Sequence, residues 1–194
     1  MKKRLRLLAW VLSLAMLCQM LPFAAFAETD LSTNATDTAT TEKSIPDDAI
    51  QFNGSHYKFY GIQDVTSNST ATWEAASQFC QNKGGHLAVI CSQEENDFLF
   101  QQMKSLGYNN ALFGFSDKEV EGTWKWVNGT QSSYTNWHYG EPNHQGSYEH
   151  YAMFYEKYTD GTWNDGSGII DRNCVFICEW DDSSLVASGV CGDN

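Results

Sequence analysis

The sequence carries two short groups of residues whose side chains offer oxygen atoms to a hard metal ion. They are Glu141-Pro142-Asn143 followed by Glu149, and Trp163-Asn164-Asp165. Together they supply three carboxylates and two amide carbonyls, and Ca²⁺ takes about six to eight such oxygens in a flexible shell. The fixed φ of Pro142 helps to hold its two neighbours on the same side of a turn. Each group taken alone fits a solvated acidic loop better than a metal site.

Motifs for other chemistries are missing from the sequence. It contains neither a phosphate-binding G-x-x-x-x-G-K-[ST] loop nor a G-x-G-x-x-G segment after a strand. It has no G-x-S-x-G turn and no H-E-x-x-H motif, and none of its five histidines stands at zinc spacing from a cysteine. A glycoside hydrolase would use paired carboxylates, but one domain of this size leaves little room for a substrate cleft. We therefore do not expect an enzyme.

The charge of the chain limits its partners. With 12 Lys and Arg against 24 Asp and Glu among 194 residues, the net charge is −12. Nucleic-acid phosphates need clustered basic side chains, so we expect no nucleic-acid partner. A large negative charge repels itself in the folded state, and bound divalent cations would relieve this where carboxylates converge.

The N-terminal residues 1–27 are typical of a secretory signal peptide. Four basic residues precede the apolar stretch 7–21, and Ala25-Phe26-Ala27 forms a cleavage site. The apolar stretch is too short for a confident membrane span. We therefore expect a secreted, extracellular protein, either free or associated with a cell surface, with no transmembrane segment after cleavage. A retained N-terminal anchor is the alternative.

The rest of the chain divides by composition into a linker, one domain and a tail. Residues 28–50 form a linker rich in Thr, Ser and Asp, residues 51–182 hold the aromatic residues of a core, and residues 183–194 are a polar tail. Within the domain we expect a helix over residues 73–83, which Gly84-Gly85 ends. Ser92 and Glu95 form a capping box for a second helix that ends at Gly107.

Beyond the second helix the helical periodicity stops and short strands are expected instead. Helices followed by strands predict an α+β domain. The long polar stretch 128–150 has no regular pattern, and a loop of that length inside a compact domain is usually functional. The expected strands cover residues 57–60, 87–90, 124–126, 152–155 and 175–178.

The order of these pieces resembles the C-type lectin domain over residues 51–182. The resemblance implies that family's α+β fold, with two helices, two small antiparallel sheets and a long Ca²⁺-binding loop region. The composition and the short signal peptide are typical of a bacterial secreted member. The matching segments are Thr72-Trp73-Glu74-Ala75, Phe79-Cys80, Gly84-Gly85-His86-Leu87-Ala88, Glu94-Glu95-Asn96, Phe113-Gly114, Glu121-Gly122, Trp124, Trp126, Asn136-Trp137, Glu141-Pro142-Asn143, Trp163-Asn164-Asp165 and Ile177-Cys178-Glu179.

The resemblance implies a calcium site that binds sugar directly. In the family, a Glu-Pro-Asn segment, a later Glu and an Asn-Asp pair ligate one Ca²⁺, which coordinates two vicinal sugar hydroxyls. The Glu-Pro-Asn form goes with mannose, fucose, glucose and N-acetylglucosamine, whereas the galactose type has Gln-Pro-Asp. Carried over, the residues that bind both the metal and the carbohydrate are Glu141, Asn143, Glu149, Asn164 and Asp165.

The family often has an auxiliary Ca²⁺ site beside the first. Its positions fall here on Asp117, Glu121, His144, Glu149 and His150. Two of the five are histidines, which are poor Ca²⁺ ligands because the ion prefers oxygen. We expect this auxiliary metal site to be weak or empty.

Aromatic residues near the ligands are expected to serve the core rather than the sugar. Trp163 should anchor Asn164 and Asp165, and four other tryptophans should also be core: Trp73, Trp124, Trp126 and Trp137. Tyr148 and His150, in the polar loop, are the more plausible neighbours of a sugar.

The cysteines match the family only in part. Cys80 and Cys178 correspond to its outer disulfide, while the positions of its inner disulfide hold Tyr151 and Gly168. Our expectation for a second pair is Cys91 with Cys174, which would leave Cys191 free or intermolecular.

These observations predict a secreted, Ca²⁺-dependent carbohydrate-binding protein. The alternative is a protein-binding module of the same fold in which calcium only orders the loop, because fold alone does not determine function.

Overall fold

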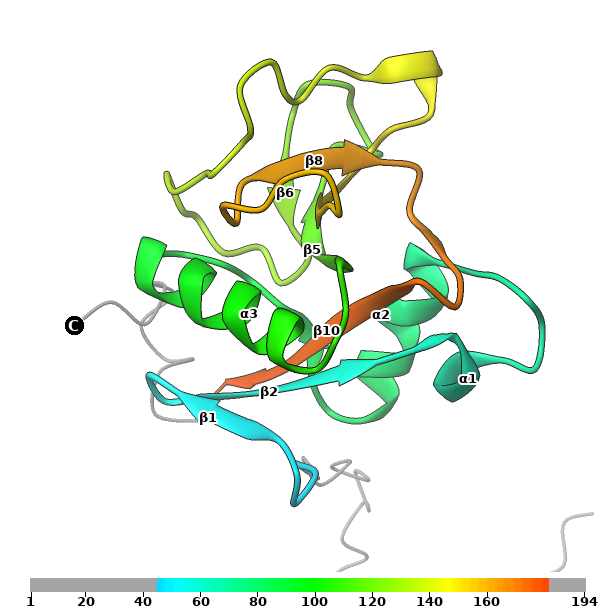
Figure 1. Cartoon of the computed structure of the whole chain (residues 1–194), viewed down its shortest axis with the longest axis vertical. Coiled ribbons are helices and arrows are strands. Elements are labelled where there is room, and N and C mark those ends of the chain that lie inside the picture. Colours follow the sequence, from blue (N-terminus) through cyan, green and yellow to red (C-terminus); the bar gives the residue numbers. More distant parts are fainter. Residues whose placement is uncertain (1–44, 182–194) are drawn as a thin grey trace, which may run out of the picture. The chain divides into compact units, whose positions relative to one another are not determined.

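The computed structural model describes residues 45–181, which fold around one hydrogen-bonded sheet with helices on its two faces (Figure 1). The predicted signal peptide, most of the linker, the tail and Cys191 fall in residues 1–44 and 182–194, which lie outside the described residues. Within 45–181 no helix is long and apolar enough to cross a membrane. The helices are α1 (Ile62–Val65), α2 (Trp73–Asn82), α3 (Gln93–Ser105) and the short 3₁₀ turn η1 (Gln145–Ser147).

The main sheet has the strand order β1-β2-β10-β5-β7-β8, with β4 added to β10 and β6 added to β5. All its pairings are antiparallel except that of β10 with β5, which is parallel. A separate two-stranded sheet pairs β3 with β9. The strands are β1 (Ile50–Phe52), β2 (Ser55–Tyr60), β3 (Ala71–Thr72), β4 (His86–Leu87), β5 (Asn110–Ser116), β6 (Lys125–Trp126), β7 (Tyr151–Phe154), β8 (Trp163–Gly166), β9 (Ile169–Ile170) and β10 (Cys174–Asp181).

The α+β class is confirmed, and the strands form one mixed sheet and a separate two-stranded sheet where two small antiparallel sheets were expected. β5 pairs with β10 on one side and with β7 on the other. It thereby joins β7 and β8 to β1, β2 and β10 in one mixed sheet. Gly114, further along β5, lets this strand approach the β4 segment closely, because a Cβ there would lie 2.7 Å from the carbonyl oxygen of Leu87. A third helix, α1, was also not expected.

Both predicted helices are present, and α3 begins where its capping box predicts. The side chain of Thr72 accepts a hydrogen bond from the backbone N–H of Ala75 at the start of α2. Ser92 accepts from the N–H of Glu95 at the start of α3, and the Glu95 carboxylate accepts from the N–H of Cys91. Gly107 follows α3 with a φ of +84°, a left-handed conformation that suits glycine and ends the helix.

Strand β10 divides the core into two clusters. Side chains alternate across a strand, and nearly every residue of β10 is buried. Val175 and Ile177 pack with residues of α3, whereas Phe176 and Cys178 pack with residues of α2 on the other face. Helices therefore cover both faces of this strand, as Figure 1 shows.

The first expected disulfide is confirmed and the second is wrong. Cys80 of α2 is bonded to Cys178 of β10. Cys91 is disulfide-bonded, but Cys174 is a free, buried thiol. The two belong to different core clusters on opposite faces of β10, and β5 pairs with the residues at Cys174. Burial, with the charge of Asp171, raises the pKa of the Cys174 thiol to about 12.

One buried charge cluster ties β4 to β10. His86 Nε2 lies 2.9 Å from Asp181, and its Nδ1 lies 3.9 Å from the buried carboxylate of Glu179. Burial lowers the pKa of His86, but the Asp181 hydrogen bond and the charges of Glu179 and Asp181 outweigh it and raise that pKa to about 9. Burial raises the pKa of Glu179 to about 8, which the charge of His86 opposes.

This cluster predicts a loss of stability at alkaline pH. A histidine whose folded pKa lies above its unfolded value stabilises the fold below about pH 6.5 and loses that contribution as pH rises through about 9. The raised pKa of Glu179 also makes the folded state less stable as pH rises, between the ordinary value of 4.5 and about 8. We expect the free energy of unfolding to fall by on the order of 3 kcal/mol between pH 6.5 and 9.5. Urea denaturation across this range measures the free energy of unfolding, and a flat or rising pH profile would contradict the prediction.

Two variants test whether His86 causes the loss. In His86→Gln the decline in stability above pH 8 should be absent, whereas His56→Gln should keep that decline.

Candidate metal centre

The long loop of residues 138–150 is fastened to β8 at both ends. At its start, the N–H of His138 donates to the carbonyl of Trp163 at 2.9 Å, beside an isolated bridge between Trp137 and Trp163. At its end, the N–H of His150 donates to the carbonyl of Gly166 at 3.0 Å. The loop is therefore held over the strand that carries Asn164 and Asp165.

This arrangement brings four of the five predicted ligands to one cleft of about 380 Å³. Glu141 and Asn143 enter it from the turn of the loop, Glu149 from just before β7, and Asn164 from β8. The β7–β8 pairing sets Asn164 opposite Met153, which also lines the cleft. Residues more than twenty positions apart, such as Glu141 and Asn164, thus meet in one cleft, in line with what the resemblance implies.

Asp165, the fifth predicted ligand, lies beneath the Glu-Pro-Asn turn. Its side chain is buried, and its two carboxylate oxygens accept the backbone N–H groups of Asn143 at 3.1 Å and of His144 at 2.7 Å. Its backbone carbonyl accepts a hydrogen bond from the Asn164 side chain. The peptide bond between Glu141 and Pro142 is cis. Asp165 therefore positions the turn, in addition to lying beside the cleft's carboxylates.

Glu141 has one paired and one unpaired carboxylate oxygen in the described structure. Its Oε1 accepts a hydrogen bond from the hydroxyl of Tyr158 at 2.7 Å, while its Oε2 is buried and has no hydrogen-bond partner among the described residues. Tyr158 is held by stacking on the ring of His138, at a centroid distance of 3.7 Å. A buried carboxylate oxygen without a partner costs free energy and favours a bound cation.

The electrostatics of the cleft also favour a cation. Burial raises the pKa of Glu141, the Tyr158 hydrogen bond opposes this, and the charges of Asp165 and Glu149 raise it further. Burial also raises the pKa of Glu149; the N–H of Gln145 opposes the rise and the charge of Asp165 adds to it. Three carboxylates thus repel one another at one place. With two amide oxygens nearby, this donor set fits Ca²⁺.

The aromatic residues lie largely as predicted. Trp163 is fully buried and its Nε1 donates to Asn96 at 2.6 Å, which confirms it as a core anchor. Trp126 is buried, and Trp73, Trp124 and Trp137 pack against the core. Tyr148 is exposed, whereas His150 turns toward Asp117 and Glu121.

Two contributors to the cleft were missed in the sequence. Tyr158 lines the cleft and donates to Glu141, and His138 stacks on the ring of Tyr158. No spacing pattern signals Tyr158, because its partner lies 17 residues away across a loop.

The auxiliary positions also come together. Asp117 is buried and accepts the N–H of Gly122 at 2.8 Å, and Glu121 lies 2.9 Å from His144. The weakness of this site toward Ca²⁺ stays a prediction.

Comparison with known proteins gives the family. A family model described as "Lectin C-type domain" matches residues 69–180, which is more than half of the chain. Asialoglycoprotein receptor 2 of Rattus norvegicus is 37% identical over 123 residues, covering 60% of this chain and 36% of the receptor. The chain therefore spans about a third of the length of this curated relative.

Solved structures agree with the fold. The cow C-type carbohydrate-recognition domain of CD23, solved in the presence of GlcNAc2Man3 oligosaccharide, has a TM-score of 0.58 at 28% identity, covering 72% of this chain and 97% of that domain. The carbohydrate-recognition domain of the human scavenger receptor C-type lectin has a TM-score of 0.57 at 31% identity, covering 71% and 99% respectively.

The chain belongs to the C-type lectin domain family, whose members include carbohydrate-recognition domains. The expectation of a bacterial member gains no support, because the relatives compared are animal proteins. A short Lys/Arg-led signal peptide and an acidic composition do not distinguish bacterial from animal secreted proteins.

Proposed function

We propose that this protein binds carbohydrate through Ca²⁺ held in the cleft of Glu141, Asn143, Glu149 and Asn164, with Asp165 beneath. The observation that carries the proposal is the buried, unpartnered Oε2 of Glu141 among three converging carboxylates. A bound ion would use that oxygen and cancel the repulsion. We propose that the chain has no enzymatic activity and is secreted.

The cleft residues supply both kinds of hydrogen-bonding group that sugar hydroxyls need. When bound, Ca²⁺ offers coordination positions to two vicinal hydroxyls of a sugar. The carboxylates of Glu141 and Glu149 accept hydrogen bonds from those hydroxyls, and the amides of Asn143 and Asn164 donate to their remaining lone pairs. Such charge-assisted hydrogen bonds are among the stronger ones in proteins.

We propose mannose, fucose or glucose-type glycans as ligands, because the acceptor carboxylate precedes Pro142 and the amide follows it. Exchanging the two functions in Glu141→Gln with Asn143→Asp keeps the net charge and reverses the order of acceptor and donor. We expect this double variant to retain Ca²⁺ binding and to bind galactose better than mannose. Competition by the two monosaccharides for an immobilised glycoprotein measures it; unchanged mannose preference would contradict the assignment.

Tyr158 should raise the Ca²⁺ affinity of the site without binding the ion itself. In Tyr158→Phe, Glu141 loses the hydroxyl at 2.7 Å that orients it. Removing an outer partner of a metal ligand typically weakens metal affinity by about 10–100-fold, and we expect the lower end here. Calorimetric titration with Ca²⁺ measures the change. Tyr155→Phe, whose ring also packs against Tyr158, serves as the matched control and should bind as the parent chain does.

The alternative function is binding of a protein, with calcium only ordering the loop. It is favoured by two exposed tyrosines, Tyr139 and Tyr148, on either side of the Glu-Pro-Asn turn. Aromatic side chains of this kind are enriched in protein interfaces.

A glycan panel probed with the full chain, in Ca²⁺ and again in excess EDTA, separates the two functions. Binding to mannose- or fucose-terminated glycans that EDTA abolishes supports the lectin. Absence of glycan binding in both buffers, with Ca²⁺ still raising the melting temperature, would support the protein-binding alternative.

A further inference from the structure

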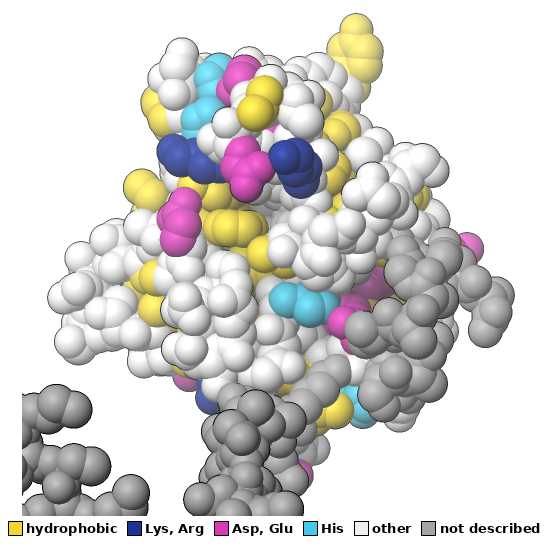
Figure 2. Space-filling model, turned by 180° about the vertical axis from the view of Figure 1, so that it is seen from behind, with side chains coloured by type: hydrophobic (Ala, Val, Ile, Leu, Met, Phe, Trp, Pro, Cys, Tyr) yellow, Lys and Arg dark blue, Asp and Glu magenta, His cyan; other side chains and the backbone are white. Residues whose placement is uncertain are grey.

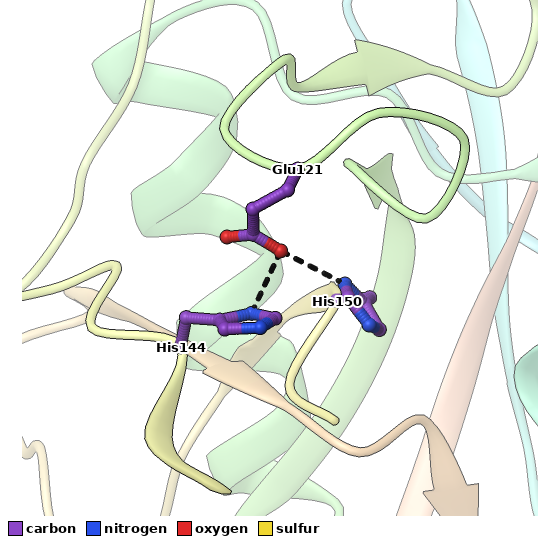
Figure 3. A group of neighbouring side chains, drawn as sticks. All are labelled: Glu121, His144 and His150. Carbon is purple, nitrogen blue, oxygen red and sulfur yellow. Dashed lines mark ion pairs between the residues drawn. The ribbon is translucent and has the colours of Figure 1, made fainter. Parts of the chain in front are cut away.

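A second cluster of metal-binding side chains lies beside the cleft but differs from it in chemistry. Glu121 comes from the segment that follows β5, whereas His144 and His150 come from the long loop. Figure 3 shows both imidazole rings turning a nitrogen toward the same oxygen of Glu121. Glu121 Oε2 lies 2.9 Å from Nδ1 of His144 and 3.5 Å from Nδ1 of His150.

The three donor atoms are close enough to share one ion. All of them lie within 4.8 Å of one another. Tetrahedral zinc with bonds of about 2.0–2.1 Å places its ligands roughly 3.3 Å apart, so small side-chain movements would complete the shell. The rings of His144 and His150, at a centroid distance of 4.9 Å, can make this adjustment because both are partly exposed.

The donor types decide which ion fits. Two imidazole nitrogens and one carboxylate suit Zn²⁺ and similar transition-metal ions, whereas Ca²⁺ and Mg²⁺ prefer oxygen alone. We propose that Glu121, His144 and His150 form a binding site for a transition-metal dication of the Zn²⁺ class, separate from the calcium cleft.

The surroundings add negative charge to this site. Asp117 is 2% exposed, and its Oδ1 lies 3.1 Å from Nδ1 of His150. The backbone carbonyl of Glu149 lies 3.1 Å from Nδ1 of His144. Histidine and acidic side chains are gathered on the surface at the end of the molecule that carries the long loop (Figure 2). With neutral imidazoles, Asp117 and Glu121 give the site two negative charges, which one dication cancels.

Metal at this site would fix the segment between the two histidines. His144 is the residue whose N–H donates to Asp165, and His150 is the residue whose N–H donates to Gly166. A metal bond to each ring would tie residues 144–150 to the segment that holds Glu121. Zn²⁺ binding at this site does not require that the protein binds carbohydrate.

A competing group exists among the described residues, at His86, Glu179 and Asp181. There His86 is already paired with Asp181 at 2.9 Å and with the Leu87 carbonyl at 2.9 Å. The Glu179 carboxylate accepts the N–H of Val89 at 2.8 Å. Because both ring nitrogens of His86 are occupied by these partners, whereas His144 and His150 use Nδ1 alone in their contacts with the described residues, this cluster is a partly buried ion pair rather than the metal site.

Calorimetric titration of the chelator-stripped full chain with Zn²⁺, in millimolar Ca²⁺, tests the proposal. We expect one Zn²⁺ per chain, and Co²⁺ in its place should give visible absorption bands of a low-coordinate site. The double variant His144→Gln with His150→Gln should weaken Zn²⁺ binding at least about 100-fold, because two ligands are lost. The variant His86→Gln should bind Zn²⁺ as the parent chain does.

Three results would overturn the proposal. They are no Zn²⁺ binding by the parent chain, undiminished binding in the double variant, and loss of binding in His86→Gln instead. Thermal melting of each variant with and without Ca²⁺ establishes that it is folded. The exposed single change Glu121→Gln, which does not touch the core, should weaken Zn²⁺ binding in the same direction as the double variant.

Discussion

Glu141→Gln is expected to abolish Ca²⁺-dependent glycan binding while leaving the domain folded. The substitution keeps the size of the side chain and removes the one negative charge whose Oε2 has no partner in the cleft. Because changes in outer partners of a metal ligand already cost about 10–100-fold in affinity, loss of a charged ligand should cost at least about 100-fold. Calcium titration by calorimetry and glycan binding at fixed Ca²⁺ measure the two effects.

The same substitution should slightly stabilise the metal-free protein. Burial and the neighbouring carboxylates disfavour the charged form of Glu141, so removing its charge removes that repulsion. The matched control is Glu119→Gln, an exposed carboxylate paired with Lys125 outside the cleft. It should leave Ca²⁺ affinity, glycan binding and stability unchanged. Normal Ca²⁺ affinity in Glu141→Gln would remove Glu141 from the metal centre.

Loss of the Cys80–Cys178 disulfide should be the largest stability effect. The bond joins α2 to β10 across a separation of 98 residues. In the chain-entropy account, closing a loop of about 100 residues stabilises a protein by roughly 4.7 kcal/mol. Cys80→Ser with Cys178→Ser should therefore lower the free energy of unfolding by about 4–5 kcal/mol, a large part of the about 5–15 kcal/mol typical of a domain. Urea denaturation of the oxidised proteins measures it.

Cys174→Ser provides the control for that experiment. Cys174 is equally buried but is a free thiol, so its replacement costs only the local packing and polarity change, on the order of 1–2 kcal/mol. Equal losses in the two variants would show that burial of sulfur, and not the cross-link, stabilises the domain. Alkylation of the parent chain should label Cys174 only after unfolding, because burial raises the pKa of its thiol.

The sequence predicted the helices well because their signals are local. Thr72 and Ser92 cap α2 and α3, and Gly107 ends α3, each through contacts within a few residues. The strand β5 was not predicted as such, because all its residues except Ser116 are buried and show no alternation. β8 was missed for another reason. Its polar residues Asn164 and Asp165 are typical of a loop, but in the structure they pair with β7.

The candidate site was predictable in composition but not in its internal organisation. The resemblance to the C-type lectin domain pointed to Glu141, Asn143, Glu149, Asn164 and Asp165, which the structure brings close together. Sequence spacing gave no indication that Asp165 would lie under the turn or that Tyr158 would orient Glu141, because both contacts depend on how the loop crosses β8. The Cys91–Cys174 expectation failed for the same kind of reason. β4 pairs with β10 at Cys178 and Glu179, whereas the part of β10 at Cys174 pairs with β5.

The most direct test of the account is binding of a mannose-terminated glycoprotein to the immobilised full chain as Ca²⁺ is titrated. The account predicts binding that rises with Ca²⁺, disappears in excess EDTA, returns when Ca²⁺ is restored, and is absent at all Ca²⁺ concentrations in Glu141→Gln. Binding of the same strength in EDTA, or full binding by Glu141→Gln, would contradict a calcium-mediated sugar site in this cleft.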